Sequence, residues 1–255
     1  MAEAYSRPAV SRGTARTAGD IDQGLRSFMI GTYNYMALGV AGTAVVVLAL
    51  LNSPAALAVI ASGPLKWVLF AAVLGLGVFA HKLFYSGSTV VAHGAYWLYC
   101  AMWGAMMAPM IYVFVSKGLI GLVGQAFFIA AATFAATSVI GYTTKKDMTG
   151  WGGFLSMASI GLIVAMLVSF FFITDPGTSK MVSFGISAVV VLLFSVATAW
   201  ETQNIKNMYI AGASSGGGEE FLNRSSIFGA FMLYGSFVTL FVHILNMLGI
   251  MNTEE

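Results

Sequence analysis

One carboxylate stands at an unusual place for an acidic residue. Glu201 directly follows the apolar run 181–200, and no Lys or Arg lies three or four residues from it. A charge in hydrocarbon costs about 3 kcal/mol or more, so an acid at that depth is kept where water, a cation or function requires it. Carboxylate oxygens are suitable ligands for Ca²⁺. Glu201 is therefore the first candidate for a contact with a metal cation.

A polar stripe lies in the last apolar run, residues 226–250. Its spacings of seven, three, four and three residues place the members on one helix face. They are Gly229, Ser236, Thr239, His243 and Asn246. One interpretation is hydrogen bonding to a neighbouring helix, with each bond worth about 0.6 kcal/mol. The other is the wall of a hydrated cavity, and His243 needs a partner or water in both.

Three basic side chains are candidates to support Glu201. His81 and Lys82 stand near the end of the apolar run 66–85, and Arg224 precedes the last run. We expect all three at the same membrane face as Glu201. A Lys at the end of a membrane helix usually extends to the interface, so a Lys82–Glu201 pair is the less favoured arrangement.

Signatures of other chemistry are missing. The chain has no nucleophile elbow, no paired carboxylates, no His-rich metal spacing and no phosphate-binding loop, so we expect neither enzymatic activity nor a cofactor. The single Cys100 cannot form an intramolecular disulfide. A helical stripe of Met102, Met106 and Met110 favours packing over a copper path. The net charge of +2 gives no argument for a nucleic-acid partner.

The composition identifies the class of protein. Of the 255 residues, 58% are hydrophobic and 9% are charged, whereas a soluble domain carries about 25% charged residues. We expect an all-α integral membrane protein with a flexible cytoplasmic tail at residues 1–26 and one transmembrane domain at residues 27–252. Seven runs are long enough to span a bilayer: 28–51, 66–85, 93–115, 119–142, 152–173, 181–204 and 226–250. The apolar piece 55–61 is too short and is expected at the interface.

Lys and Arg are distributed unevenly between the two membrane faces. With the N-terminus in the cytoplasm, nine of the twelve fall on the cytoplasmic side: Arg7, Arg12, Arg16, Arg26, Lys82, Lys145, Lys146, Lys206 and Arg224. The other side carries Lys66, Lys117 and Lys180. Short loops rich in Lys and Arg stay in the cytoplasm. We therefore expect a cytoplasmic N-terminus and, after seven spans, a C-terminus outside.

Two segments resemble a known family. Residues 134–148, FAATSVIGYTTKKDM, and residues 198–206, TAWETQNIK, resemble signatures of the Bax inhibitor family, also called the transmembrane Bax inhibitor motif family. Residues 228–234, FGAFMLY, also match, and the head, with IDQGLR at residues 21–26, resembles bacterial members of the YccA branch. The resemblance implies a seven-helix bundle with the last helix at its centre, in a bacterial inner (plasma) membrane.

The resemblance also implies a function. Members of this family leak Ca²⁺ across membranes, with a pH response assigned to two facing Asp residues on the sixth and seventh helices. Those positions are Glu201 and Ser236 here. Two close carboxylates share a proton, whereas a Glu–Ser pair has no such coupling. The leading expectation is a calcium or cation leak channel in ion homeostasis and stress response, with weakened pH gating and Glu201 as the Ca²⁺ contact.

Two further functions stay open. Bacterial relatives have been tied to restraint of a membrane-bound protease, so one alternative is a non-conducting regulator of membrane proteins such as a quality-control protease. A weaker alternative is a proton-coupled transporter that uses Glu201 or His243. In each case the lipid bilayer is the common partner.

Overall fold

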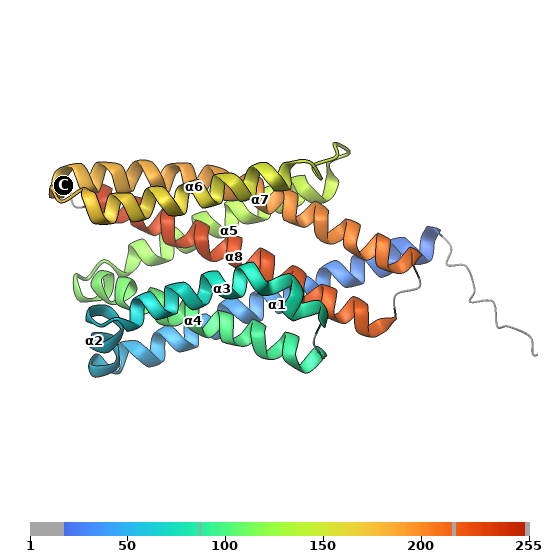
Figure 1. Cartoon of the computed structure of the whole chain (residues 1–255), viewed down its shortest axis with the longest axis horizontal. Coiled ribbons are helices and arrows are strands. Elements are labelled where there is room, and N and C mark those ends of the chain that lie inside the picture. The colour runs from blue at the N-terminus through green and yellow to red at the C-terminus, as the bar shows by residue number, and fades with distance from the viewer. Residues whose placement is uncertain (1–17, 87, 216–217, 253–255) are drawn as a thin grey trace, which may run out of the picture.

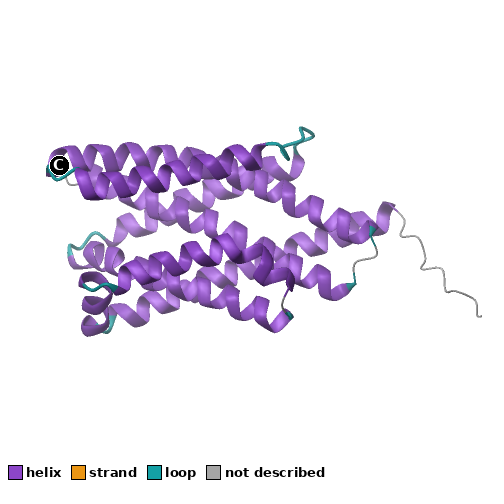
Figure 2. Ribbon diagram, viewed as in Figure 1, coloured by secondary structure: helices purple, strands orange, loops and turns teal. Residues whose placement is uncertain are grey.

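The chain folds into a bundle of long helices. The computed structural model describes residues 18–86, 88–215 and 218–252, and every regular element in these ranges is a helix (Figures 1 and 2). The helices are α1 (Ala18–Leu51), α2 (Pro54–Ser62), α3 (Leu65–Ser86), α4 (Thr89–Ser116), α5 (Ile120–Thr143), α6 (Trp151–Phe172), α7 (Pro176–Ser214) and α8 (Glu219–Asn252). All but α2 are long and apolar enough to cross a membrane. This confirms the all-α fold with seven spans.

The last helix occupies the centre of the bundle. α8 packs against α1, α3, α4, α5 and α7 (Figure 1). In its most apolar stretch 67% of the residues are buried, compared with 6% in α6, which lies at the periphery. Gly229 on α8 allows this close packing, because a Cβ there would lie 3.0 Å from Thr32 and 3.2 Å from Ile205. The expected central position of the last helix is confirmed.

Small residues also bring α5 and α7 together. A Cβ atom on Gly141 of α5 would collide with the carbonyl oxygen of Ala199 on α7. Helices in a membrane associate through such close packing, because lipid supplies no hydrophobic force between them. This contact fixes the position of α7 two residues before Glu201.

Two helices extend beyond the predicted membrane spans. α1 begins at Ala18, inside the predicted tail, while residues 1–17 lie outside the described ranges. α7 continues to Ser214, well beyond the predicted end at residue 204. The extension is polar in part, but Ile205 and Tyr209 are buried, and the Tyr209 ring packs on Phe28 of α1 with 5.1 Å between centroids. Tertiary packing therefore keeps the segment helical.

Successive spans alternate in direction. Within the described residues, one end of the bundle collects the start of α1 and the helix ends near Lys82, Lys146 and Arg224 (Figure 1). The opposite end collects Lys66 and the other two basic residues expected outside. Arg7, Arg12 and Arg16 fall outside the described residues. The structure contains no membrane, so the orientation stays a prediction, and we name the two ends of the bundle the basic end and the opposite end.

Candidate functional site: a carboxylate between α7 and α8

Glu201 of α7 points to α8. The Ser236 hydroxyl donates a hydrogen bond to Oε2 of Glu201, and the two oxygens are 2.8 Å apart. Ser236 is 1% exposed, whereas Glu201 is half-buried. The structure thus brings together the two positions that the resemblance pairs. Within the described part of the chain one neutral donor binds the carboxylate, which leaves room for another ligand.

No cation neutralises Glu201 among the described residues. Its hydrogen bond to Ser236 is the one polar contact recorded for it there. The nearest Lys on α7, Lys206, donates to the carbonyl oxygen of Tyr142 at 3.2 Å and lies over the Tyr142 ring at 5.1 Å. The cationic group that follows Glu201 along α7 is therefore directed to α5.

The expected support from Arg224 is not present. The Arg224 guanidinium lies 3.7 Å from the Glu220 carboxylate and donates to the carbonyl oxygen of Tyr85 at 3.4 Å. Arg224 also precedes Ser236 by twelve residues on α8, which is about 18 Å along a helix. Arg224 therefore belongs to the basic end of the bundle and not to the Glu201 site.

His81 and Lys82 do not support Glu201 either. Both lie on α3, whose backbone runs close to α2, α4 and α8 but not to α7 in the part of the chain that the structure describes. The His81 ring lies 4.9 Å from that of Tyr85 and 6.1 Å from that of Phe228. The sequence placed His81 and Lys82 near the end of a membrane helix. That position indicates their depth in the membrane, but it does not indicate which helix they face.

Two aromatic residues of α4 complete the site. The Tyr99 hydroxyl faces α8, where a Cβ on Gly235 would lie 3.1 Å from it, and Tyr99 is near enough to Glu201 for an electrostatic interaction. The Trp103 ring stands edge-on to Tyr99, with 6.3 Å between centroids. Its indole Nε1 is buried and has no hydrogen-bond partner within the described ranges. The Tyr99 phenol thus stands near the carboxylate, and the Trp103 ring packs against that phenol.

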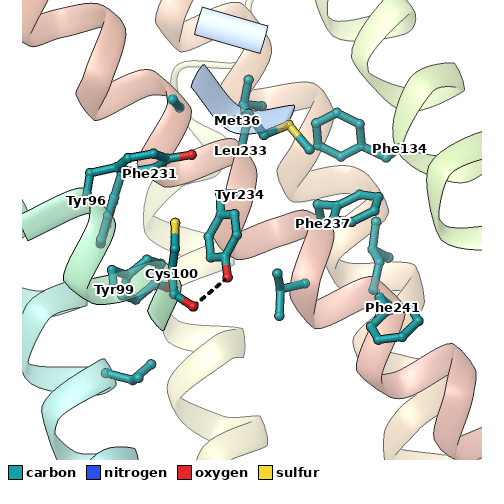
Figure 3. Close-up of a cluster of buried hydrophobic side chains, with 14 of the residues drawn as sticks. Met36, Tyr96, Tyr99, Cys100, Phe134, Phe231, Leu233, Tyr234, Phe237 and Phe241 are labelled. Carbon is teal, nitrogen blue, oxygen red and sulfur yellow. Dashed lines mark hydrogen bonds between the residues drawn. The ribbon is translucent and has the colours of Figure 1, made fainter. Parts of the chain in front are cut away.

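Beside this site α4 and α8 share a polar contact. Figure 3 shows Tyr96, Tyr99 and Cys100 of α4 around Tyr234 of α8, whose hydroxyl donates to the Cys100 carbonyl oxygen at 3.5 Å. The same hydroxyl lies 2.6 Å from Oγ1 of Thr43 on α1. Buried polar groups in a membrane protein need partners inside the protein, and these three helices provide them. The contact holds α4 against α8.

A seam of hydroxyl groups runs from Glu201 towards the basic end. Thr202, next in the chain, lies 3.5 Å from the Tyr33 hydroxyl and donates to Ser138 at 3.5 Å. Nearer the basic end, Thr32 and Ser226 are 3.1 Å apart. These groups join α1, α5, α7 and α8 without any charged residue. Among the described residues of this seam Glu201 is the acid, and the other members are neutral.

The polar stripe of α8 turns towards α7 at the opposite end. His243 Nδ1 is 3.0 Å from the Ser187 hydroxyl, and Asn246 donates to Ser183 and Ser187, both at 2.9 Å. Thr239 instead donates to the carbonyl oxygen of Gly235 on its own helix at 2.8 Å. His243 and Asn246 also line a cavity of about 480 Å³. His243 and Asn246 therefore make the expected hydrogen bonds to a neighbouring helix, and the hydration of the cavity stays a prediction.

The site does not resemble a resident metal centre. Within the described residues no three His, Cys, Asp or Glu side chains come together. Ca²⁺ takes six to eight oxygen ligands, and Glu201 with Ser236 would supply only a few of them. Water would have to supply the rest. Such a site suits transient contact with a hydrated cation.

The two loop carboxylates have a structural role. The Thr149 hydroxyl donates to Asp147 at 2.5 Å and the Thr149 backbone N–H donates at 2.9 Å, and together they lower the pKa of that carboxyl. The backbone N–H of Thr178 donates to Asp175 at 2.7 Å, which caps α7 and lowers the pKa of the Asp175 carboxyl. Both loop acids are therefore ionised at neutral pH.

Comparison with known proteins identifies the family. The family model described as inhibitor of apoptosis-promoting Bax1 matches residues 25–253. The chain belongs to the Bax inhibitor family. Membership agrees with the seven spans and the central α8.

Several Bax inhibitor relatives are bacterial. The chain is 36% identical to an uncharacterised protein of Deinococcus radiodurans, over 89% of this chain and 91% of that protein. It is 31% identical to an uncharacterised protein of Rickettsia prowazekii, with the same two coverages. The inner membrane protein YbhL of Escherichia coli is 30% identical over 89% of this chain and 92% of YbhL. These likenesses and the seven apolar helices support a multi-pass protein of the inner membrane.

Proposed function

We propose that this Bax inhibitor family protein is a cation leak channel that passes Ca²⁺, with Glu201 as the ligand at membrane depth. The observation that carries the proposal is the environment of Glu201. The carboxylate is half-buried between α7 and α8, accepts one hydrogen bond from Ser236, and has no cationic partner among the described residues.

The physical argument begins with the cost of the charge. An ionised carboxylate away from bulk water is stabilised by a counter-ion or by several hydrogen bonds. Glu201 receives one such bond from the protein. A passing hydrated cation would provide the missing stabilisation, and oxygen ligands favour hard cations such as Ca²⁺. A single carboxylate binds weakly enough to release the ion.

The primary test is Ca²⁺ flux into proteoliposomes that contain an indicator dye. Glu201→Gln keeps the size of the side chain but removes its charge, and we expect flux to fall by at least about tenfold, since an interaction with a charged group is worth about 1.5–3 kcal/mol. The matched control is Glu219→Gln, which removes an exposed carboxylate at the start of α8. Flux in the control should equal that of the wild type.

Other outcomes of the flux assay would favour the alternative function, a non-conducting regulator of membrane proteins. If the wild-type protein passes no Ca²⁺, or if Glu201→Gln passes as much as the wild type, the proposed role of Glu201 is wrong. A non-conducting regulator would then be tested by deletion of residues 1–20, which should abolish its effect on a partner membrane protein.

A further inference from the structure

A second polar site lies at the opposite end of the bundle. A partly open cavity of about 480 Å³ lies between α6, α7 and α8, and its apolar lining comes from Met166, Phe170, Ile173 and Ile186. Its polar lining comes from six side chains: Ser169, Ser179, Ser183, Ser187, His243 and Asn246. A cavity of this size has room for on the order of ten water molecules. We name it the outer cavity, from the side of the membrane on which the distribution of Lys and Arg places it.

The outer cavity is built to hold water and not lipid. Asn246 donates to both Ser183 and Ser187, and His243 lies against Ser187, so these side chains are held in fixed positions. Hydrocarbon could not satisfy the remaining lone pairs of the hydroxyl groups or the oxygen of the Asn246 amide. Ser179 lies in the first turn of α7, at the edge of the bundle, where the cavity can exchange water with the solvent.

Its chemistry suits a hydrated cation. The lining offers hydroxyl and amide oxygens, which are hard ligands of the kind that Ca²⁺ accepts. Among the described residues its lining contains no Asp, Glu, Lys or Arg, so these side chains would neither trap a divalent ion nor repel it. One imidazole without a second His or Cys does not make a transition-metal site.

The outer cavity and Glu201 share one helix face. On α8, His243 follows Ser236 by seven residues, two turns or about 10 Å along the axis. On α7, Ser187 precedes Glu201 by fourteen residues, or about 21 Å along the axis. Val191, Phe194 and Thr198 occupy the positions between them on the same face; Val191 and Phe194 pack against the core, and the Thr198 hydroxyl donates to the carbonyl oxygen of Phe194. The two polar sites are therefore separated by a mostly apolar interval.

We propose that the outer cavity is the entrance through which hydrated cations reach Glu201 from the far side of the membrane. This inference rests on the proposed channel function. It adds a site, contributed by Ser183, Ser187 and Asn246, at which the ion keeps most of its water. The ion then crosses the apolar interval at Val191 and Phe194 and meets the carboxylate.

Cysteine modification tests the entrance. In a Cys100→Ala background, Ser183→Cys is treated with a trimethylammonium-ethyl methanethiosulfonate in proteoliposomes, and the adduct is measured by intact mass. We expect complete reaction and at least a fivefold fall in Ca²⁺ flux, because a fixed positive charge in the cavity repels cations. Ser179→Cys, at the rim, provides a second variant and should behave in the same way.

The matched control is Leu192→Cys, whose position on α7 is 70% exposed on the apolar exterior. A thiol facing lipid does not ionise and should not react, and flux should stay unchanged. If neither serine variant reacts, or if they react without loss of Ca²⁺ flux, the outer cavity is not the entrance. Either result would leave a Glu201-dependent leak intact. If both the wild type and the unmodified Cys100→Ala protein pass no Ca²⁺, the channel function itself is wrong.

Discussion

Gly141 of α5 and Ala199 of α7 are in direct backbone contact, and no side chain fits between them. The contact lies two residues before Glu201, so it sets how far the carboxylate extends towards Ser236. The position of the acid thus depends on a glycine of a different helix.

Gly141→Ala should therefore destabilise the protein. The added methyl group would collide with the Ala199 carbonyl oxygen, and overpacking of this kind costs about 1–3 kcal/mol. Thermal unfolding in detergent should show a lower midpoint. Gly161→Ala on α6 is the control, because nothing lies within 4 Å of a Cβ there; alanine favours a helix by up to about 1 kcal/mol, so its midpoint should not fall. Equal midpoints for the two variants would contradict the contact.

Ser236→Asp should make the leak depend more steeply on pH. An Asp at this position would place a second carboxyl beside Glu201, where the Ser236 hydroxyl is now 2.8 Å from Oε2. Two such groups share a proton, which raises the pKa of one of them. As pH rises, the pair passes from one negative charge to two. Ca²⁺ flux should then vary by a larger factor between about pH 6 and pH 8 than in the wild type, and Ser236→Ala should show no such increase.

The loop acids should not contribute to that pH response. Hydrogen bonds from Thr149 and Thr178 lower the pKa values of Asp147 and Asp175. A lowered pKa stabilises the folded loop above the ordinary Asp value of about 3.9, and this contribution is lost as pH falls through the folded value. Asp147→Asn and Asp175→Asn should each leave the flux–pH profile unchanged above about pH 5. If the flux–pH profile of either variant shifts along the pH axis, a loop acid contributes to pH sensing and the prediction is wrong.

Gln203→Ala should release the loop between α5 and α6. The Gln203 amide accepts from the Met148 backbone N–H at 2.7 Å and donates to the Lys146 carbonyl oxygen at 2.8 Å. Loss of both bonds should destabilise the docked loop by about 1–3 kcal/mol. Trypsin should then cleave after Lys145 and Lys146 faster than in the wild type. Asn207→Ala, at an exposed position one turn further along α7, should leave the cleavage rate unchanged.

The number of spans and the central α8 could be predicted, because hydropathy and the family signatures both depend on long contiguous segments. The proximity of Glu201 and Ser236 followed from the resemblance alone. Tyr99 could not be predicted as a neighbour of Glu201. An aromatic residue in a membrane helix carries no sign of which helix it faces.

Only part of the outer cavity's lining could be predicted from the sequence. His243 and Asn246 stood out as a stripe, but Ser183 and Ser187 are scattered hydroxyls within an apolar run. Their role depends on how α7 rotates against α8. The helical extension beyond residue 204 was missed for a related reason, since burial of Ile205 and Tyr209 by α1 and α8 is a tertiary effect.

The hydrogen bonds of Gln203 have a consequence beyond the stability of the loop. Gln203 follows Glu201 by two residues on one rigid helix, so a rotation of α7 that moves the carboxylate also displaces both bonds to the loop. We expect ion occupancy deep in the membrane to alter the shape of the protein's water-exposed surface around Lys146 and Met148.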